Sequence, residues 1–559
     1  MKTISLRLLC GVGLWLVLSV RPAAAFTNLT AVPDPVFPSP GVPSPQMHTA
    51  SSLAVSGDTM VVGSWREQGS ATGVNSTPNQ ALIDAGAAFV FVRDGSNWVV
   101  QAYLKASNTE SGDSFGHAVA ISGDTIVVGA PGEGSNATVI NGNQSNNSAS
   151  SAGAAYVFVR SGTNWSQQAY LKASNTEAND LFGMSVAVWG DTIVVGAIGE
   201  ASNAGGVNGN QADNSVVGAG AAYVFVRSGS TWSQQAYLKA STPRFDNQFG
   251  YAVAMATNTL VVGARRESSA ATGINGDAAD NSAYQAGAAY VFVRSGSTWS
   301  QQAYLKGANT ESSDVFGTSV AIAGDTVVVG APGEASNATG VDGNPANNSS
   351  YQAGAAYVFF RTGVTWSQQA YLKASNTESS DQFGAAVAVH GDNIVVGAPW
   401  ESSDANGVNG NQNNNDRYHS GAAYLFNRSA NTWSQPYYLK AAPLYSGSEN
   451  QFGGRVALTE DFVVVGSVNA DEIGSFVDTT PPPPAMPSRI EFITVTPTEV
   501  TLECTGQPEA NYHLLRKENL EEGWSFIGFG TAQLDGTFTL MDYDPPSDAA
   551  FYALQLDQP

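Results

Sequence analysis

The sequence predicts an all-β protein, a seven-bladed β-propeller followed by a small β-sandwich. The first reason is a fixed internal period, because one supersecondary unit repeated many times produces such a period. Six tryptophans mark it at intervals of 67 residues: Trp98, Trp165, Trp232, Trp299, Trp366 and Trp433. The second reason is composition. Only 13% of the residues are charged and 59 are glycine, which disfavours long amphipathic helices and favours strands joined by turns.

Each repeat reads as four short strands. In residues 115–181 the segments "HAVAIS", "TIVVGA", "GAAYVFVR" and "WSQQAYLKA" are alternating or β-branched runs. "GDT" separates the first two, a 22-residue polar loop (131–152) separates the next two, and "SGTN" separates the last two. Short strands bounded by turn residues at this spacing predict one four-stranded propeller blade.

The number of repeats predicts seven blades. The segment ending in "VVG" occurs seven times, and the later pair of strands occurs six times. "GSFVDT" from Gly474 is a weak candidate for the third strand of the seventh blade, whose fourth strand and closure the repeat leaves open. Atypical terminal repeats are normal in an array, and a closed ring protects strand edges.

The ends of the chain read differently from the array. Lys2 and Arg7 precede an apolar run, and Ala23 and Ala25 follow it, a pattern typical of a signal peptide cleaved after Ala25. We therefore expect a secreted or cell-surface protein. The predicted divisions are a signal peptide (1–25), a Pro-rich N-terminal segment (26–46), the propeller (47–478), a Pro-rich linker (479–487) and the β-sandwich (488–559).

Charge and cysteine content narrow the partners. Loss of the leader leaves 21 of the 24 basic residues against 47 acidic ones, a balance that repels nucleic acid and anionic lipid. One cysteine, Cys504, remains, so no internal disulfide is expected. After the leader no apolar run is long enough to span a bilayer.

The phrase "FGxxVAxxGDTxVVGAPxE … GAAYVF" resembles the bacterial FG-GAP repeat, which is related to the integrin α-subunit propeller. The resemblance covers roughly residues 47–478 and implies a seven-bladed propeller with an adhesive role. Integrin-type repeats carry a calcium loop between the first two strands, but this chain has "GDT" there, as at Asp124 and Asp191, so that site does not carry over. The segment 488–559 resembles fibronectin-III-like modules of secreted bacterial proteins.

Most repeated residues are predicted to be architectural. Phe115 and Gly116, with their counterparts, are expected to pack between blades, because a residue present in every blade serves what every blade needs. The tryptophans receive the same interpretation. The lysines of the "YLK" segments are expected to discourage edge pairing on an outer strand.

The acidic residues of the loops suggest calcium, because that ion prefers oxygen ligands. The candidate metal ligands are Glu133, Glu200, Glu267, Asp277, Glu334, Asp342 and Glu401. Turn capping by the Asx residues is the competing interpretation. A further acidic motif, "TExxD", pairs Glu110 with Asp113 and recurs; we expect solvated turns between blades rather than acid–base catalysis.

The predicted function is a non-catalytic binding or adhesion scaffold for an extracellular protein or glycan, because the long loops leave each blade at the same point. No HExxH, G-x-S-x-G or phosphate-loop motif occurs. One alternative is an extracellular, for instance carbohydrate-active, enzyme with its site in the irregular fourth repeat, where Arg244, Arg265 and Arg266 are the candidate ligand-binding residues. The other is a structural surface-layer or matrix protein.

Overall fold

The computed structural model describes residues 26, 29–32, 51–95, 97–441, 449–468 and 473–478, together with the backbone of six strands between 489 and 556. The predicted signal peptide and Pro-rich linker lie outside the described residues. Contacts divide the chain into two units, and 25–479 forms one of them. Within the described part there is no helix, and hence none that could cross a membrane.

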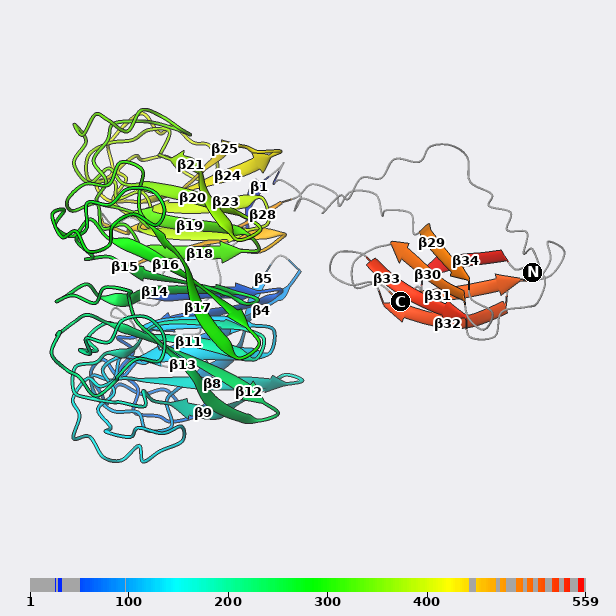
Figure 1. The fold of residues 1–559 in the computed structure, drawn as a ribbon, viewed down its shortest axis with the longest axis horizontal. Helices are drawn as coiled ribbons and strands as arrows, with labels where there is room; N and C mark the ends of the chain where they lie inside the picture. The colour runs from blue at the N-terminus through cyan, green and yellow to red at the C-terminus, as the bar shows by residue number, and fades with distance from the viewer. Residues whose placement is uncertain are drawn as a thin grey trace. The chain divides into compact units, whose positions relative to one another are not determined.

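Six blades share one plan, drawn in Figure 1, in which four consecutive strands form one antiparallel sheet. The second blade consists of β6 (Ala118–Ser122), β7 (Thr125–Ala130), β8 (Ala154–Ser161) and β9 (Asn164–Leu171). These are the four strands predicted from the repeat, so the prediction is confirmed. Tight turns join the first strand to the second and the third to the fourth at one end of the blade, and the long loop joins the second to the third at the other end.

The other five complete blades follow in chain order. Their strands are β2 (Ser52–Ser56), β3 (Thr59–Ser64), β4 (Ala87–Asp94) and β5 (Asn97–Leu104); β10 (Phe182–Trp189), β11 (Thr192–Ala197), β12 (Ala221–Ser228) and β13 (Thr231–Leu238); β14 (Phe249–Ala256), β15 (Thr259–Ala264), β16 (Ala288–Ser295) and β17 (Thr298–Leu305); β18 (Ser319–Ala323), β19 (Thr326–Ala331), β20 (Ala355–Thr362) and β21 (Thr365–Leu372); and β22 (Ala386–His390), β23 (Asn393–Ala398), β24 (Ala422–Ser429) and β25 (Thr432–Leu439).

The seventh blade joins the two ends of the propeller. It contains β26 (Phe452–Leu458), β27 (Phe462–Ser467), β28 (Ile473–Asp478) and, as its outer strand, β1 (Leu29–Val32). β28 coincides with the weak third strand expected from Gly474. β1 pairs antiparallel with β28, so the propeller begins within the segment 26–46 rather than at residue 47. A strand from the N-terminal end thus closes the ring, which removes an exposed edge.

The core lies between successive blades. Phe115 is fully buried and packs against Tyr156 and Phe158 of its own blade in a cluster that also holds residues of the first blade. Gly116 has a φ of +88°, and a Cβ there would lie 2.2 Å from the Ala87 carbonyl oxygen of the preceding blade. Only glycine fits that approach without strain. The prediction that this Phe-Gly pair packs blade against blade is confirmed.

The C-terminal unit is described by its strands. β29 (Arg489–Val495), β30 (Val500–Thr505) and β33 (Thr537–Asp542) form one three-stranded sheet. β31 (Asn511–Lys517), β32 (Ser525–Thr531) and β34 (Phe551–Leu556) form another, with β31 in the centre. All pairings are antiparallel, as expected for a small all-β module.

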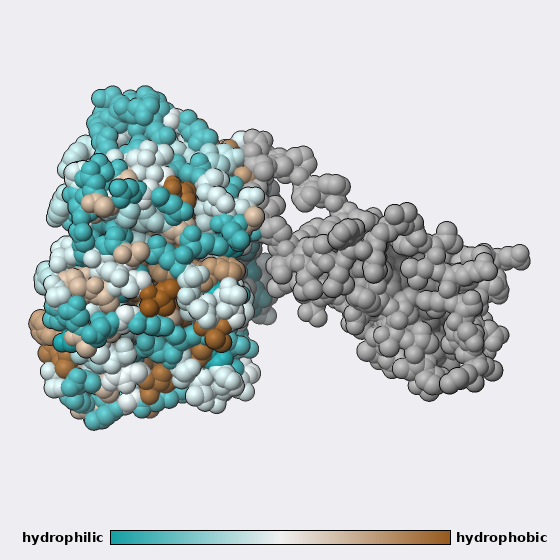
Figure 2. All heavy atoms as spheres, turned by 45° about the horizontal axis from the view of Figure 1, so that its top comes forward, coloured by the Kyte–Doolittle hydropathy of each residue, from teal (hydrophilic) through white to brown (hydrophobic). Residues whose placement is uncertain are grey.

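Two features of the propeller surface bear on function. In Figure 1 the long loops gather on one side of the propeller, which we call the loop face. The tight turns emerge at the opposite ends of the blades and define the turn face. In the view of Figure 2 most of the visible propeller surface is hydrophilic, and hydrophobic residues occur in small separate patches. On this face the hydrophobic side chains are therefore scattered rather than gathered into one large patch.

Candidate functional site

A buried ion pair recurs in each of the first six blades beneath the long loops. It joins the glutamate that follows the second strand to the lysine that follows the fourth. The pairs and their Oε2–Nζ distances are Glu67–Lys105 (2.7 Å), Glu133–Lys172 (2.9 Å), Glu200–Lys239 (2.6 Å), Glu267–Lys306 (3.0 Å), Glu334–Lys373 (2.8 Å) and Glu401–Lys440 (2.8 Å). The lysine side chains are at most 1% exposed and the glutamates at most 3%.

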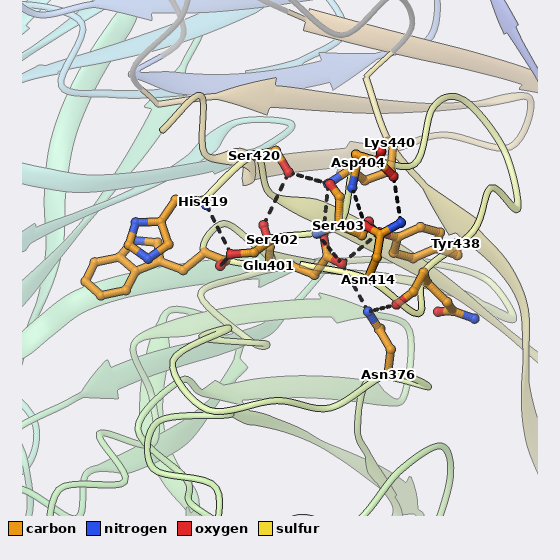
Figure 3. Close-up of polar contacts among 12 residues, drawn as sticks. Asn376, Glu401, Ser402, Ser403, Asp404, Asn414, His419, Ser420, Tyr438 and Lys440 are labelled. Atoms are coloured by element: carbon orange, nitrogen blue, oxygen red, sulfur yellow. Dashed lines mark hydrogen bonds and ion pairs between the residues drawn. The ribbon is translucent and has the colours of Figure 1, made fainter. Parts of the chain in front are cut away.

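Figure 3 shows this ion pair in the sixth blade with its surrounding hydrogen bonds. The Ser403 amide, the Asn376 side-chain amide and the Tyr438 hydroxyl all donate to Oε1 of Glu401, at 3.1, 3.0 and 2.9 Å. Lys440 donates to Oε2 at 2.8 Å. Both carboxylate oxygens are thus occupied by protein donors. Burial lowers the pKa of Lys440, and the adjacent Glu401 opposes that shift.

This arrangement corrects the prediction for the lysines. Lys105 and its five counterparts do not guard an outer strand edge, because their side chains are buried and end on a glutamate. A buried charge of this kind is tolerated only when it is paired and hydrogen-bonded. The repeat places the partners about 39 residues apart, as in Lys172 and Glu133, a separation too long to be read as a pair from the sequence.

The calcium prediction placed a cation beside the same glutamates. In the structure the cation beside Glu133, Glu200, Glu267, Glu334 and Glu401 is a lysine ammonium. Among the described residues, no group of three or more His, Cys, Asp or Glu side chains is placed to hold a metal ion. Calcium binding therefore stays a prediction, for which chelation is the test.

The two aspartates in the calcium set stabilise their own loops. Asp277 accepts a hydrogen bond from the Ala279 amide two residues later, at 2.8 Å. Asp342 accepts one from the Tyr371 amide at 2.9 Å, while its own amide donates to the Tyr371 carbonyl. The second contact ties the long loop to the outer strand of the same blade. Both are the turn- and loop-capping roles that Asx side chains commonly take.

The aspartates of the "TExxD" motif are buried, not solvated as expected. Asp113 is 5% exposed and accepts a hydrogen bond from the Glu110 amide at 2.8 Å, so the turn itself is as predicted. Burial, aided by the charge of Glu133, raises the pKa of Asp113 to about 7. Burial likewise raises the pKa of Asp381 to about 8. These carboxyls are close enough to neutral pH to change charge under ordinary conditions.

On the turn face a cluster of polar and aromatic contacts joins successive blades. In the fifth blade, Arg361 pairs with Asp325 at 2.7 Å, lies over the Trp366 ring and donates to Thr259 of the fourth blade at 3.0 Å. The Trp366 indole donates to Gln302 of the fourth blade at 2.8 Å. The repeated tryptophan is thus a packing residue that also carries a hydrogen bond between blades, as its spacing suggested.

The three arginines of the irregular fourth repeat already have protein partners. Arg266 pairs with Asp246 at 2.6 Å, and Arg244 donates to the Ala279 carbonyl. Arg265 lies 3.8 Å over the Tyr251 ring, and burial lowers its pKa. These partners account for the arginines structurally and leave their predicted ligand-binding role untested.

Some unusual residues were not singled out by the repeat analysis. Arg455 of the seventh blade donates to the Ser51 carbonyl at 2.5 Å and lies near His117 of the second blade. The pKa of His117 is lowered mainly by burial and, to a smaller extent, by the positive charge of Arg455. On the loop face, exposed residues recur at one position of the long loops: Ile83, Val217, Tyr284, Tyr351 and Tyr418. Alignment of the repeats by their 67-residue period was the signal available for both sets.

Comparison with known proteins identifies the repeat. The FG-GAP repeat family matches residues 98–158, 165–225, 232–292, 299–359 and 366–426, more than half of the chain. Each match starts in the outer strand of one blade and ends in the third strand of the next. No curated protein matches the chain.

Two solved structures show only distant likeness. The crystal structure of the polysaccharide lyase Uly1 has 8% identity and a TM-score of 0.36, covering 77% of this chain and 90% of its own. The Bacteroides ovatus xyloglucan PUL GH43B structure has 9% identity and a TM-score of 0.24, and the match covers 94% of this chain and 98% of that structure's chain. At these scores neither bears on the activity of this chain. The five repeat matches, which cover more than half of the chain, show that it belongs to the FG-GAP repeat family.

Proposed function

We propose that this protein is a non-catalytic binding scaffold whose loop face holds an extracellular glycan or protein. The observation that carries the proposal is a row of tyrosines in the long loops of three consecutive blades. Tyr284, Tyr351 and Tyr418 are 66%, 65% and 58% exposed. Large exposed aromatic side chains offer flat contact area together with a hydroxyl, a combination typical of recognition surfaces.

The rigidity beneath these loops supports a binding role. Each tyrosine lies a few residues before the glycine that precedes the third strand, and its carbonyl accepts a hydrogen bond from the next inter-blade turn. Tyr284, for example, accepts from the Ser313 amide at 2.8 Å. The buried glutamate–lysine pairs anchor the bases of the same loops. A surface held in place before binding loses less conformational entropy when a ligand docks.

The proposal extends to the parts of the chain beyond the propeller. The leader-like segment 1–25 supports secretion from a bacterial cell. The two sheets of β29–β34 support a terminal β-sandwich similar to fibronectin-III-like modules. A secreted scaffold with a binding propeller and a small terminal module suits attachment to a surface or matrix.

The test uses the full chain against a glycan array and immobilised extracellular matrix proteins. The variant Tyr284→Ser/Tyr351→Ser/Tyr418→Ser places in three blades the residue that the second blade has naturally, Ser150. We expect the wild type to bind at least one glycan or matrix protein and the triple variant to bind it at least tenfold more weakly. The control Val364→Ser changes a residue that is 78% exposed in a tight turn of the opposite face. Equal binding by the triple variant would contradict the proposal.

A further inference from the structure

A cavity on the turn face lies where the third and fourth blades meet, on the side of the propeller away from the tyrosine row. It is shallow and open to solvent, and its volume is about 450 Å³. Trp189, Arg227, Gln235, Thr257, Asn258 and Arg294 are among its lining residues. The same junction occurs between other blades, so this one can be compared with its counterparts residue by residue.

The first departure from the repeat is a missing carboxylate. The turn between the first two strands carries an aspartate that binds the arginine of the third strand, as in Asp325 with Arg361 and Asp191 with Arg227. The fourth blade has Asn258 at this position. Arg294 donates Nε to Asn258 at 2.9 Å and Nη1 to Thr192 at 2.9 Å.

Arg294 therefore lacks the carboxylate counter-ion that its counterparts have. Arg361 and Arg227 each pair with an aspartate at 2.7 Å, whereas Arg294 meets only the neutral side-chain oxygen of Asn258 at that place. The cavity is lined by two arginines and one aspartate, so its charged lining is net positive in a chain of net charge −23. A guanidinium without a counter-ion favours a carboxylate or sulfate.

The second departure is a large aromatic residue. Trp189 ends β10 and is 48% exposed, whereas the equivalent positions of the neighbouring blades hold Ser122 and Ala256. Ser122 is a small residue whose hydroxyl accepts a hydrogen bond from the Gly190 amide of the next blade, at 3.1 Å. An exposed indole on the cavity wall offers an apolar face to a ring, and Gln235 adds an amide.

The third departure is a strained turn. Thr257 has a φ of +49°, where the equivalent residues Gly190 and Gly324 have φ values of +52° and +54°. A β-branched residue in the left-handed region is unfavourable, and such strain gathers at functional sites. Three departures, in charge, in aromatic surface and in turn residue, thus converge on one cavity from two adjacent turns.

The geometry points to a second binding site here, for an anionic sugar. The carboxylate or sulfate of the sugar would be bound by Arg294, the apolar face of the ring would stack on Trp189, and hydroxyls would meet Gln235 and Thr257. A simple inorganic anion would use only the arginine, and a neutral sugar only the indole. The site is independent of the tyrosine row, so either can fail without the other.

The test is calorimetric titration of the full chain with a tetramer of galacturonic acid, a sulfated tetrasaccharide, a neutral tetrasaccharide and inorganic sulfate. The variants Asn258→Asp and Trp189→Ser restore residues found in other blades, so both are expected to fold with an unchanged melting temperature. We expect saturable binding of one or both anionic sugars and at least a tenfold loss in each variant. Which of the two anionic sugars binds distinguishes carboxylate from sulfate recognition.

The control Asp325→Asn removes the same charge from the fifth blade, where Ala256 rather than tryptophan borders the turn. We expect this variant to bind the sugar as tightly as the wild type. Three results would overturn the proposal. They are no saturable binding of either anionic sugar by the wild type, binding by Asn258→Asp as tight as that of the wild type, and sulfate bound as tightly as the sugars. A loss of binding in the triple tyrosine variant would instead move the sugar site to the loop face.

Discussion

The fourth and fifth blades occupy neighbouring places in the ring and differ in charge mainly in the segments between their strands. Both keep the buried ion pair beneath the long loop, Glu267–Lys306 at 3.0 Å and Glu334–Lys373 at 2.8 Å. Both also keep the same four-stranded antiparallel sheet. The interior of the blade is therefore insensitive to the changes that make the fourth blade irregular.

The differences in charge between the two blades lie in turns and loops. The fourth blade has Thr257-Asn258 where the fifth has Gly324-Asp325. It also has Asn247 in place of the buried Asp314. Residues that pack against the neighbouring blade are therefore restricted in type. Residues of the turns can vary and acquire a local role. Four experiments sharpen or break that distinction.

The largest effect is expected from the buried ion pair. Lys373→Met and Lys306→Met each leave a buried carboxylate without its counter-ion, at a cost of about 3–5 kcal/mol of unfolding free energy. Equilibrium unfolding in urea measures the loss. The double variant Lys373→Met/Glu334→Gln recovers part of it, because no charge is then buried. A much smaller loss in the fourth blade than in the fifth would break the equivalence of their interiors.

A smaller effect is expected at two glycines of the ring. Gly384 has a φ of +90°, and a Cβ would lie 2.2 Å from the Ala355 carbonyl oxygen, so Gly384→Ala should cost roughly 2–4 kcal/mol through strain and overlap. Gly324, at +54° with no atom within 4 Å of a Cβ, should cost only about 1 kcal/mol when changed to alanine. Urea unfolding of both variants separates packing from turn strain. Similar costs would contradict this account of the Phe-Gly pair.

A pH effect of intermediate to small size is expected from the buried aspartates. Burial is the main reason that the pKa of Asp314 in the folded state is raised to about 7, above its value near 3.9 in an unfolded chain. The folded state therefore holds the extra proton, so its stabilising effect is full below about pH 4 and is lost as the pH rises through 7. Melting temperature should fall between pH 5 and pH 8.

The fourth blade naturally has Asn247 at the position of these buried aspartates, so asparagine is the matched substitution. Replacement of the aspartates by asparagine should flatten the melting profile between pH 5 and pH 8 while the propeller still folds. The four positions are Asp113, Asp180, Asp314 and Asp381. An unchanged slope in the fourfold variant would show that other groups control the pH response.

The smallest effect is expected from removal of calcium. Because lysine ammonium groups occupy the glutamate sites, a chelator should leave the melting temperature within about 1 °C of the untreated protein. Thermal unfolding with and without chelator, followed by added calcium, measures this. A fall that calcium restores would support the predicted calcium site in the loops.

Repetition made the fold readable but concealed the pairings. The 67-residue period, the alternating strands and the turn residues predicted four strands per blade and seven blades, because those are local features repeated many times. The long loops hid the partner of each glutamate, since the lysine follows two strands later. For the same reason the "YLK" lysines and the "TExxD" aspartates were expected in solvent, although both are buried.

What the sequence determined by itself is the unit: its strands, its turns, the aromatic residues between blades and the glycines that allow close approach. Only the tertiary structure decided how the ring closes, with Leu29–Val32 pairing to β28 more than 440 residues away, and how Trp189 and Arg294 come to border one cavity. The physical reason is that periodicity and turn chemistry act between near neighbours. Counter-ion choice, ring closure and pocket formation depend on which distant groups the closed ring brings within contact.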